Sequence, residues 1–195
     1  MLVTSDGSIL EGFFSGGHAN GKARRITVAD REEYVGDWQD DLRHGHGEVS
    51  TADGNRYSGS WERDCKHGSG IERWSDGASY NGAFFEGLKQ GEGTFQWADG
   101  SSYTGTFHEN MIHGQGTYKW SDGRIYTGGW KENKMDGFGR FTWDDGRSYE
   151  GEYLVDKKHG RGKFSWPDGR VYDGLWQDGR QHGIGSYTSA DGRTR

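Results

Sequence analysis

The spacing of histidine in this chain is the first pattern that suggests chemistry. Intervals of 23 residues, or of twice 23, separate five of them: His44, His67, His113, His159 and His182. Imidazole binds metal ions and transfers protons near neutral pH. A metal site needs ligands that converge within a few Å, whereas equivalent positions of a repeat lie one repeat apart. The spacing therefore favours a structural role, next to the glycine that opens a strand.

A zinc site is the metal-binding alternative that the spacing leaves open. Imidazole and thiolate side chains from two successive repeats would supply its ligands: His44, His46, Cys65 and His67. Cysteine and histidine are the ligands that zinc prefers. We otherwise predict no metal, no cofactor and no catalytic residue.

Glycine and aspartate pairs also recur, and both have a simpler explanation than ligand binding. Gly-x-Gly occurs from Gly45 to Gly185 without the third glycine and the helix of a dinucleotide site. No Gly-Lys-Ser/Thr or Gly-x-Ser-x-Gly segment is present. The aspartates of the Asp-Gly pairs could suggest calcium, but hydrogen bonding to the backbone of a turn accounts for them.

All these residues belong to one repeat of 23 residues. A tyrosine marks its start seven times: Tyr34, Tyr57, Tyr80, Tyr103, Tyr126, Tyr149 and Tyr172. A glycine follows two residues later and an aromatic residue four residues later, as in Gly151 and Tyr153. Leu10 takes the tyrosine position of a first, degenerate unit. The chain therefore contains eight units.

The repeat explains an unusual composition. Its fixed positions hold 31 of the 36 glycines and 25 of the 28 aromatic residues. The single cysteine excludes an internal disulfide and favours a reducing compartment. No apolar run is long enough to span a membrane. The net charge of -6 argues against nucleic-acid binding, which depends on basic side chains.

Large or glycine positions alternate with polar ones in each half of the repeat, and this period of two predicts strands. The Asp-Gly pair predicts a tight turn between repeats, and residues 108–112 typify the short polar loop between the halves. Tyrosine, glycine and the following aromatic residue share one face, and threonine, lysine and glutamate lie on the other. Glycine should leave room for neighbouring rings to lie across the backbone.

The predicted fold is all-β: an elongated, single-layer antiparallel meander, a solenoid-like rod of eight hairpins. Residues 1–195 form a single array. Repeats start near residues 6, 30, 53, 76, 99, 122, 145 and 168, with a partial ninth from residue 191.

The pattern resembles the MORN (membrane occupation and recognition nexus) repeat. The resemblance is carried by Tyr-Glu-Gly-Glu-Tyr at 149–153, His-Gly-Arg-Gly at 159–162 and Asp-Gly-Arg-Val-Tyr at 168–172. It implies a twisted single-layer sheet with a groove, and scaffold, partner-binding and membrane-associated roles. It also implies two alternatives: the regulatory or targeting region of a phosphatidylinositol phosphate kinase or SET methyltransferase, or a phospholipid-binding module. The loops carry nine cations and nine anions, which predicts no strong membrane binding and leaves weak phospholipid contact open.

We predict a non-enzymatic scaffold that binds other proteins, such as a helix or an extended peptide, along its aromatic face. The resemblance and the single cysteine favour a cytoplasmic location, with cytoskeletal or membrane association as the family's further implication. A single-layer sheet has no second layer to cover its aromatic face. The predicted groove residues are Trp74, Trp97, Trp120, Trp143, Trp166, Tyr103, Tyr126, Tyr149, Phe107 and Trp130.

The last predicted strand suggests self-association. It has neither charge nor proline between Gly183 and Ala190, the devices that usually protect a sheet edge. Two copies meeting at this edge would form a homodimer. The alternative is that the chain is a fragment whose ninth repeat covers this edge. The predicted dimer edge comprises Gly183, Ile184, Ser186, Tyr187 and Thr188.

Overall fold

The computed structural model describes all residues from 1 to 195 and contains strands and turns without helices. It divides into two compact units, residues 1–98 and residues 99–195. The first unit contains β1(Leu2–Val3), β2(Ile9–Ser15), β3(His18–Ile26), β4(Glu33–Gln39), β5(Leu42–Ser50), β6(Arg56–Glu62), β7(Cys65–Arg73), β8(Ser79–Phe85) and β9(Leu88–Gln96). The second contains β10(Ser102–His108), β11(Met111–Lys119), β12(Ile125–Lys131), β13(Lys134–Thr142), β14(Ser148–Leu154), β15(Lys157–Ser165), β16(Val171–Gln177) and β17(Arg180–Thr188).

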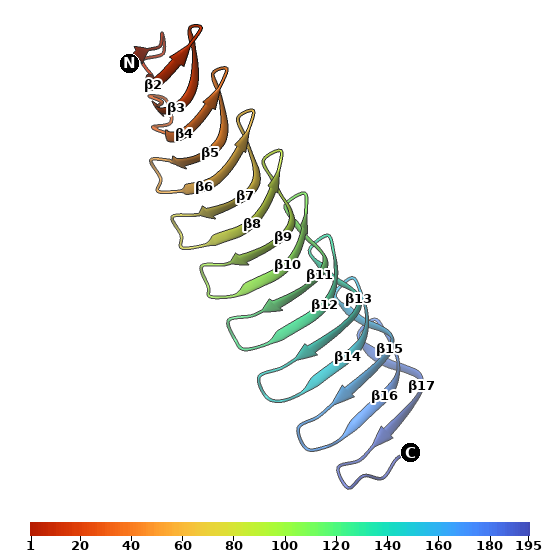
Figure 1. The fold of residues 1–195 in the computed structure, drawn as a ribbon. Helices are drawn as coiled ribbons and strands as arrows, with labels where there is room; N and C mark the ends of the chain where they lie inside the picture. The colour runs from red at the N-terminus through yellow and green to blue at the C-terminus, as the bar shows by residue number, and fades with distance from the viewer. The chain divides into compact units, whose positions relative to one another are not determined.

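Within each unit, every strand pairs in antiparallel fashion with the strands before and after it in the chain. Figure 1 shows the resulting order, in which each hairpin lies beside the next one of its unit. The prediction of an all-β, single-layer antiparallel meander is therefore confirmed.

The register brings like positions together. In the second unit Gly116 pairs with Gly128, Tyr118 with Tyr126, and Thr117 with Thr127. We call the side of the sheet that carries the tyrosine and glycine positions the inner face, and the opposite side the outer face. The predicted assignment of faces is therefore correct.

The turn inside each hairpin is shorter than the sequence suggested. Only Glu109 and Asn110 separate β10 from β11, and both have positive φ, 48° and 67°. Two positive φ angles define the type I′ turn, whose twist matches that of paired strands. Asparagine and aspartate tolerate this conformation, and the five-residue loop predicted at 108–112 is thus a two-residue turn.

Glycine-linked irregularities bend the hairpins. The pairing of β12 with β13 shifts between Gly128 and Trp130, and Gly137 near the start of β13 has a φ of 86°. A bulge of this kind bends its strand and increases the local twist. The bend brings the inner-face rings against one another.

The first repeat, which contains Leu10, forms the same hairpin in spite of its altered sequence. Leu10 of β2 pairs with Arg25 of β3, and the register shifts between Gly12 and Phe14 as in later hairpins. Ala23 stands where later repeats have the glycine that a tyrosine ring covers. A leucine side chain in place of tyrosine leaves space for that methyl group.

Candidate partner-binding surface

The tyrosine that starts seven of the repeats is buried on the inner face. Tyr126 is fully buried, and its hydroxyl donates a hydrogen bond of 3.0 Å to the carbonyl oxygen of Gly129. A Cβ atom at Gly128 or Gly139 would overlap the oxygen of this hydroxyl. The same tyrosine bond occurs in all seven repeats that have the tyrosine. Glycine at these positions is therefore required by the ring that lies over it.

Edge-to-face ring contacts join successive hairpins. The Tyr149 ring contacts Tyr153 of its own strand and Trp176 of the next hairpin, each with a centroid distance of 5.2 Å. The indole Nε1 of Trp176 also donates a hydrogen bond of 2.9 Å to the carbonyl oxygen of Gly162. Such ring pairs add stabilising free energy to that gained from the area they bury. These rings form the interior of a sheet that has no second layer.

Five of the ten predicted groove residues belong to this interior. Their exposed fractions lie between 0% and 7%: Tyr103, Tyr126, Tyr149, Phe107 and Trp130. Because bent hairpins enclose them, the surface available to a partner is narrower than the sequence suggested.

The remaining five are the tryptophans near the end of the second strand of a repeat. We call them the tryptophan column, and all are half-buried: Trp74, Trp97, Trp120, Trp143 and Trp166. In the second unit, Trp143 lies between Phe141, 4.4 Å away, and Phe164, 5.5 Å away, measured between ring centroids. Trp120 contacts Tyr118 and Phe141 in the same way, at 4.5 and 5.2 Å. The column is therefore held in place by rings and partly open to solvent.

A hollow of about 250 Å³ adjoins the column in the second unit. Its lining includes Met135, Phe141, Trp143, Tyr153 and Lys158. Lys157 and Asp156 also line the hollow. Rings beside a few charged groups suit a protein segment whose apolar side chains flank a polar group.

Four repeats place a cation over the rings of the inner face, nine residues after the tyrosine. These cations are Arg43, Lys66, Lys89 and Lys158. The ammonium of Lys158 lies 4.6 Å from the Phe164 centroid and 4.9 Å from the Trp176 centroid. Burial lowers the pKa of Lys158 to about 8, with a smaller effect from the nearby Arg147 charge. Burial also raises the pKa of Tyr80 to about 12.

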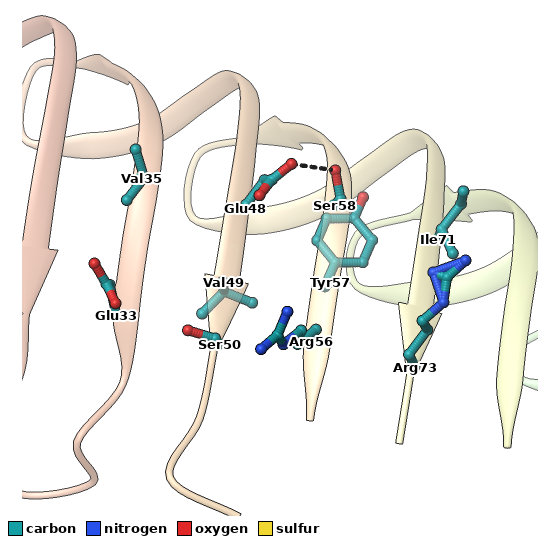
Figure 2. Close-up of a pocket in the computed structure, with 10 residues that line it drawn as sticks. All are labelled: Glu33, Val35, Glu48, Val49, Ser50, Arg56, Tyr57, Ser58, Ile71 and Arg73. Atoms are coloured by element: carbon teal, nitrogen blue, oxygen red, sulfur yellow. Dashed lines mark hydrogen bonds between the residues drawn. The ribbon is translucent and has the colours of Figure 1, made fainter. Parts of the chain in front are cut away.

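A second hollow, of about 740 Å³, lies in the first unit and is lined mainly by the outer face of β4 to β7. Figure 2 shows Val35, Glu48, Ser58 and Ile71 as one row across these strands. Ser58 donates a hydrogen bond of 3.0 Å to Glu48, the one side-chain bond drawn in the hollow. The one ring in its lining, Tyr57, is buried, so the hollow offers a partner no exposed ring.

The residues that could have bound zinc do not converge. The structure contains no group of three or more histidine, cysteine, aspartate or glutamate side chains placed to hold a metal ion. His67 instead lies 3.5 Å from Glu62 and stacks against Phe85. The four side chains are therefore not placed to hold a metal ion within one chain.

The Asp-Gly turns follow the prediction of backbone bonding. The Asp145 carboxylate accepts bonds from the Arg147 amide and guanidinium, at 3.1 and 2.7 Å. The corresponding aspartates 122 and 168 do the same. The turn thus uses the carboxylates that a calcium site would need.

The dimer-edge residues lie on β17, which pairs with β16 on one side. Ile184 is 86% exposed. On the other side, the amide and carbonyl of Tyr187 bond to Arg195, at 3.1 and 2.9 Å. The tail at Arg195 thus covers one end of the predicted edge, and the strand from Arg180 to Ser186 extends beyond it.

The comparisons with known proteins agree with this repeat architecture. The MORN repeat family model matches seven segments: residues 34–56, 57–79, 80–102, 103–123, 126–146, 149–169 and 172–192. The chain therefore belongs to the MORN repeat family. The predicted first repeat, which contains Leu10, falls outside these matches. The structure shows it as the hairpin of β2 and β3.

Solved structures resemble this chain at low sequence identity. The TCP10 domain of CPAP from Danio rerio aligns with a TM-score of 0.51 and 13% identity, covering 100% of this chain and 91% of that one. The TCP domain of SAS-4 from Drosophila melanogaster, solved with a proline-rich motif of Ana2, aligns with a TM-score of 0.48 and 10% identity. It covers 77% of this chain and 82% of that one. No curated protein matches the chain. The structure has no helix of the length and apolarity needed to cross a membrane.

Proposed function

We propose that this chain is a non-enzymatic scaffold that binds a segment of another protein along the tryptophan column of its second unit. The observation that carries the proposal is the state of Trp120, Trp143 and Trp166, which are fixed by neighbouring rings and remain half-exposed. Rigid aromatic side chains of this kind dominate protein-protein binding energies. An extended peptide or the apolar side of a helix would cover them.

The position of the loop cations favours a protein partner over a membrane surface. Arg43, Lys66 and Lys89 lie over inner-face rings and also pair with carboxylates of the chain. Membrane attraction depends on basic side chains collected at a surface, and these three are committed elsewhere. Weak phospholipid contact and attachment to a lipid kinase or methyltransferase remain the alternative roles.

A peptide selection tests the proposal. Random peptides displayed on phage would be selected against the 195-residue protein, and the strongest binder would be synthesised for titration. We expect Trp120→Ala and Trp143→Ala to weaken binding by about tenfold or more each, as for central aromatic contacts. Phe138→Ala is the matched control, because Phe138 is an aromatic residue of the outer face and 62% exposed.

Circular dichroism and thermal melting would show that the variants are folded. A peptide that binds both folded tryptophan variants as tightly as the wild type would contradict the proposal, as would equal weakening by Phe138→Ala.

A homodimer through β17 is a second proposal, supported by the exposed Ile184 and by the uncovered length of this strand. Edge strands without charge or proline pair readily with a second strand.

A further inference from the structure

The cations over the inner-face rings differ in one respect, which is whether the chain supplies a carboxylate to them. Arg43 of the first unit forms an ion pair of 2.8 Å with Glu32. Lys66 and Lys89 both pair with Glu72, the second at 3.6 Å. Each of these cations therefore combines ring contacts with an opposite charge.

Lys158 of the second unit has the rings without the carboxylate. Its ammonium lies within 5.2 Å of four ring centroids, those of Trp143, Tyr149, Phe164 and Trp176. Phe164 occupies the repeat position that Glu72 occupies beside Lys66, 15 residues after the tyrosine. No carboxylate of the chain forms an ion pair with Lys158, and the one charge that shifts its pKa is the cationic Arg147, which lowers it.

Nearby charged groups are already committed to other contacts. Asp156, which lines the same hollow, accepts a hydrogen bond of 2.8 Å from the Met135 amide. Lys157 pairs with Asp178 at 3.5 Å. A partly buried ammonium without an anion is unfavourable unless a ligand provides one.

We propose that Lys158 binds the carboxylate of a partner segment, an aspartate or glutamate side chain flanked by apolar residues. The apolar flanks would contact Trp143 and Met135 along the hollow, and the carboxylate would take the place that Glu72 has beside Lys66. A charge-assisted hydrogen bond formed against aromatic rings is stronger than one in water. This inference rests on the proposed function, because the segment is the one that lies along the tryptophan column.

The test uses the peptides selected against the whole protein. We expect these peptides to be enriched in aspartate or glutamate beside apolar residues. In the strongest binder, replacing that acid by its amide should weaken binding to the wild type by about tenfold or more. With Lys158→Met, the acid and amide peptides should bind with equal, weaker affinity.

Lys66→Met is the matched control. It also removes a cation from above inner-face rings, but Glu72 keeps Lys89 as its partner. The control should therefore still prefer the acid peptide by the wild-type factor. Lys158→Met should fold, since it exchanges an unpaired ammonium for an apolar side chain of similar length, and circular dichroism would verify this.

The outcomes separate this inference from the proposed function. Selected peptides without acid enrichment that still depend on Trp143 would overturn the role of Lys158 and leave the tryptophan column as the binding surface. An unchanged preference for acid in Lys158→Met would have the same meaning. Failure to select any peptide would overturn both, and binding of anionic vesicles that depends on Lys158 would assign the site to a lipid headgroup.

Discussion

Glycine and tyrosine form a single packing unit at the scale of the residue. The glycine that Tyr126 covers, Gly139, is buried, and its neighbour Arg140 is exposed on the outer face. A Cβ atom at Gly139 would overlap the Tyr126 hydroxyl and ring. The cost of a substitution should therefore depend on the face and not on the strand.

We expect Gly139→Ala to lower the free energy of unfolding by about 1–3 kcal/mol, because the added methyl displaces a fully buried ring. Arg140→Ala, one residue away, should change it by less than about 0.5 kcal/mol. Urea denaturation of the two variants measures both values. Equal losses would mean that the ring does not lie over the glycine.

The pH dependence of stability should report Lys158. Its pKa is about 8 in the folded protein and about 10.4 in an unfolded chain. Between these values the unfolded state binds more protons than the folded state, so stability should rise with pH. Chemical denaturation at pH 7, 8 and 9 (about one unit apart, across the lower part of this window) would show the rise, and Lys158→Met should reduce it.

The tyrosines act in the opposite direction at higher pH. Burial raises the pKa of Tyr80 to about 12, whereas an unfolded tyrosine loses its proton near pH 10. Above that pH the unfolded state releases protons that the folded state keeps, and stability should fall.

A stability curve that is flat from pH 7 to about 9 would contradict the burial of Lys158.

At the scale of the element, the hairpin depends on a pair of positions that change together. Later repeats combine tyrosine with glycine, and the first hairpin combines Leu10 with Ala23. Leu10→Tyr alone should destabilise the protein, because the Ala23 methyl occupies the space of the new ring. The double variant Leu10→Tyr with Ala23→Gly should recover stability, giving a favourable coupling energy of about 0.5–3 kcal/mol.

Thermal melting of the wild type, both single variants and the double variant completes this cycle. Additive effects would show that the first hairpin is packed differently from the others. The indole of Trp38, which donates a hydrogen bond of 3.1 Å to the Ala23 carbonyl, should remain in place in each variant.

Much of this hairpin could be predicted from the sequence, because a period of two and a strict repeat determine the strands and their faces. The type I′ turns were missed since Glu109 and Val155 are not residues that usually adopt positive φ. The burial of Tyr103 and Trp130 was missed for a different reason. It follows from the bend at each bulge, and the glycine pattern indicates flexibility of φ without giving the direction of a bend.

The surroundings of Lys158 could not be predicted from the sequence for the same reason. Its place nine residues after the tyrosine is visible in the sequence, but its contact with four rings depends on the bent hairpin. Comparison of Glu72 with Phe164 at one repeat position was the signal that could have identified the missing carboxylate.

For the whole molecule, we expect self-association through β17. Light scattering from low to high micromolar concentration should show a dimer, and Ile184→Lys should shift the mass toward the monomer, because a charged side chain protects an edge. A monomer at all concentrations would exclude the dimer. Phe138→Lys, on the outer face away from this edge, is the control.

The inner face combines an interior of rings with an accessible tryptophan column, which we propose receives a partner. Hydroxyl-radical footprinting with mass spectrometry measures this directly, in the free protein and with the selected peptide. We expect Trp120, Trp143 and Trp166 to be oxidised readily and to become protected by the peptide. Trp130 and Trp176, each 7% exposed, should react slowly in both states. Equal oxidation of all five tryptophans, or protection by the peptide at Phe138 of the outer face instead, would contradict the account.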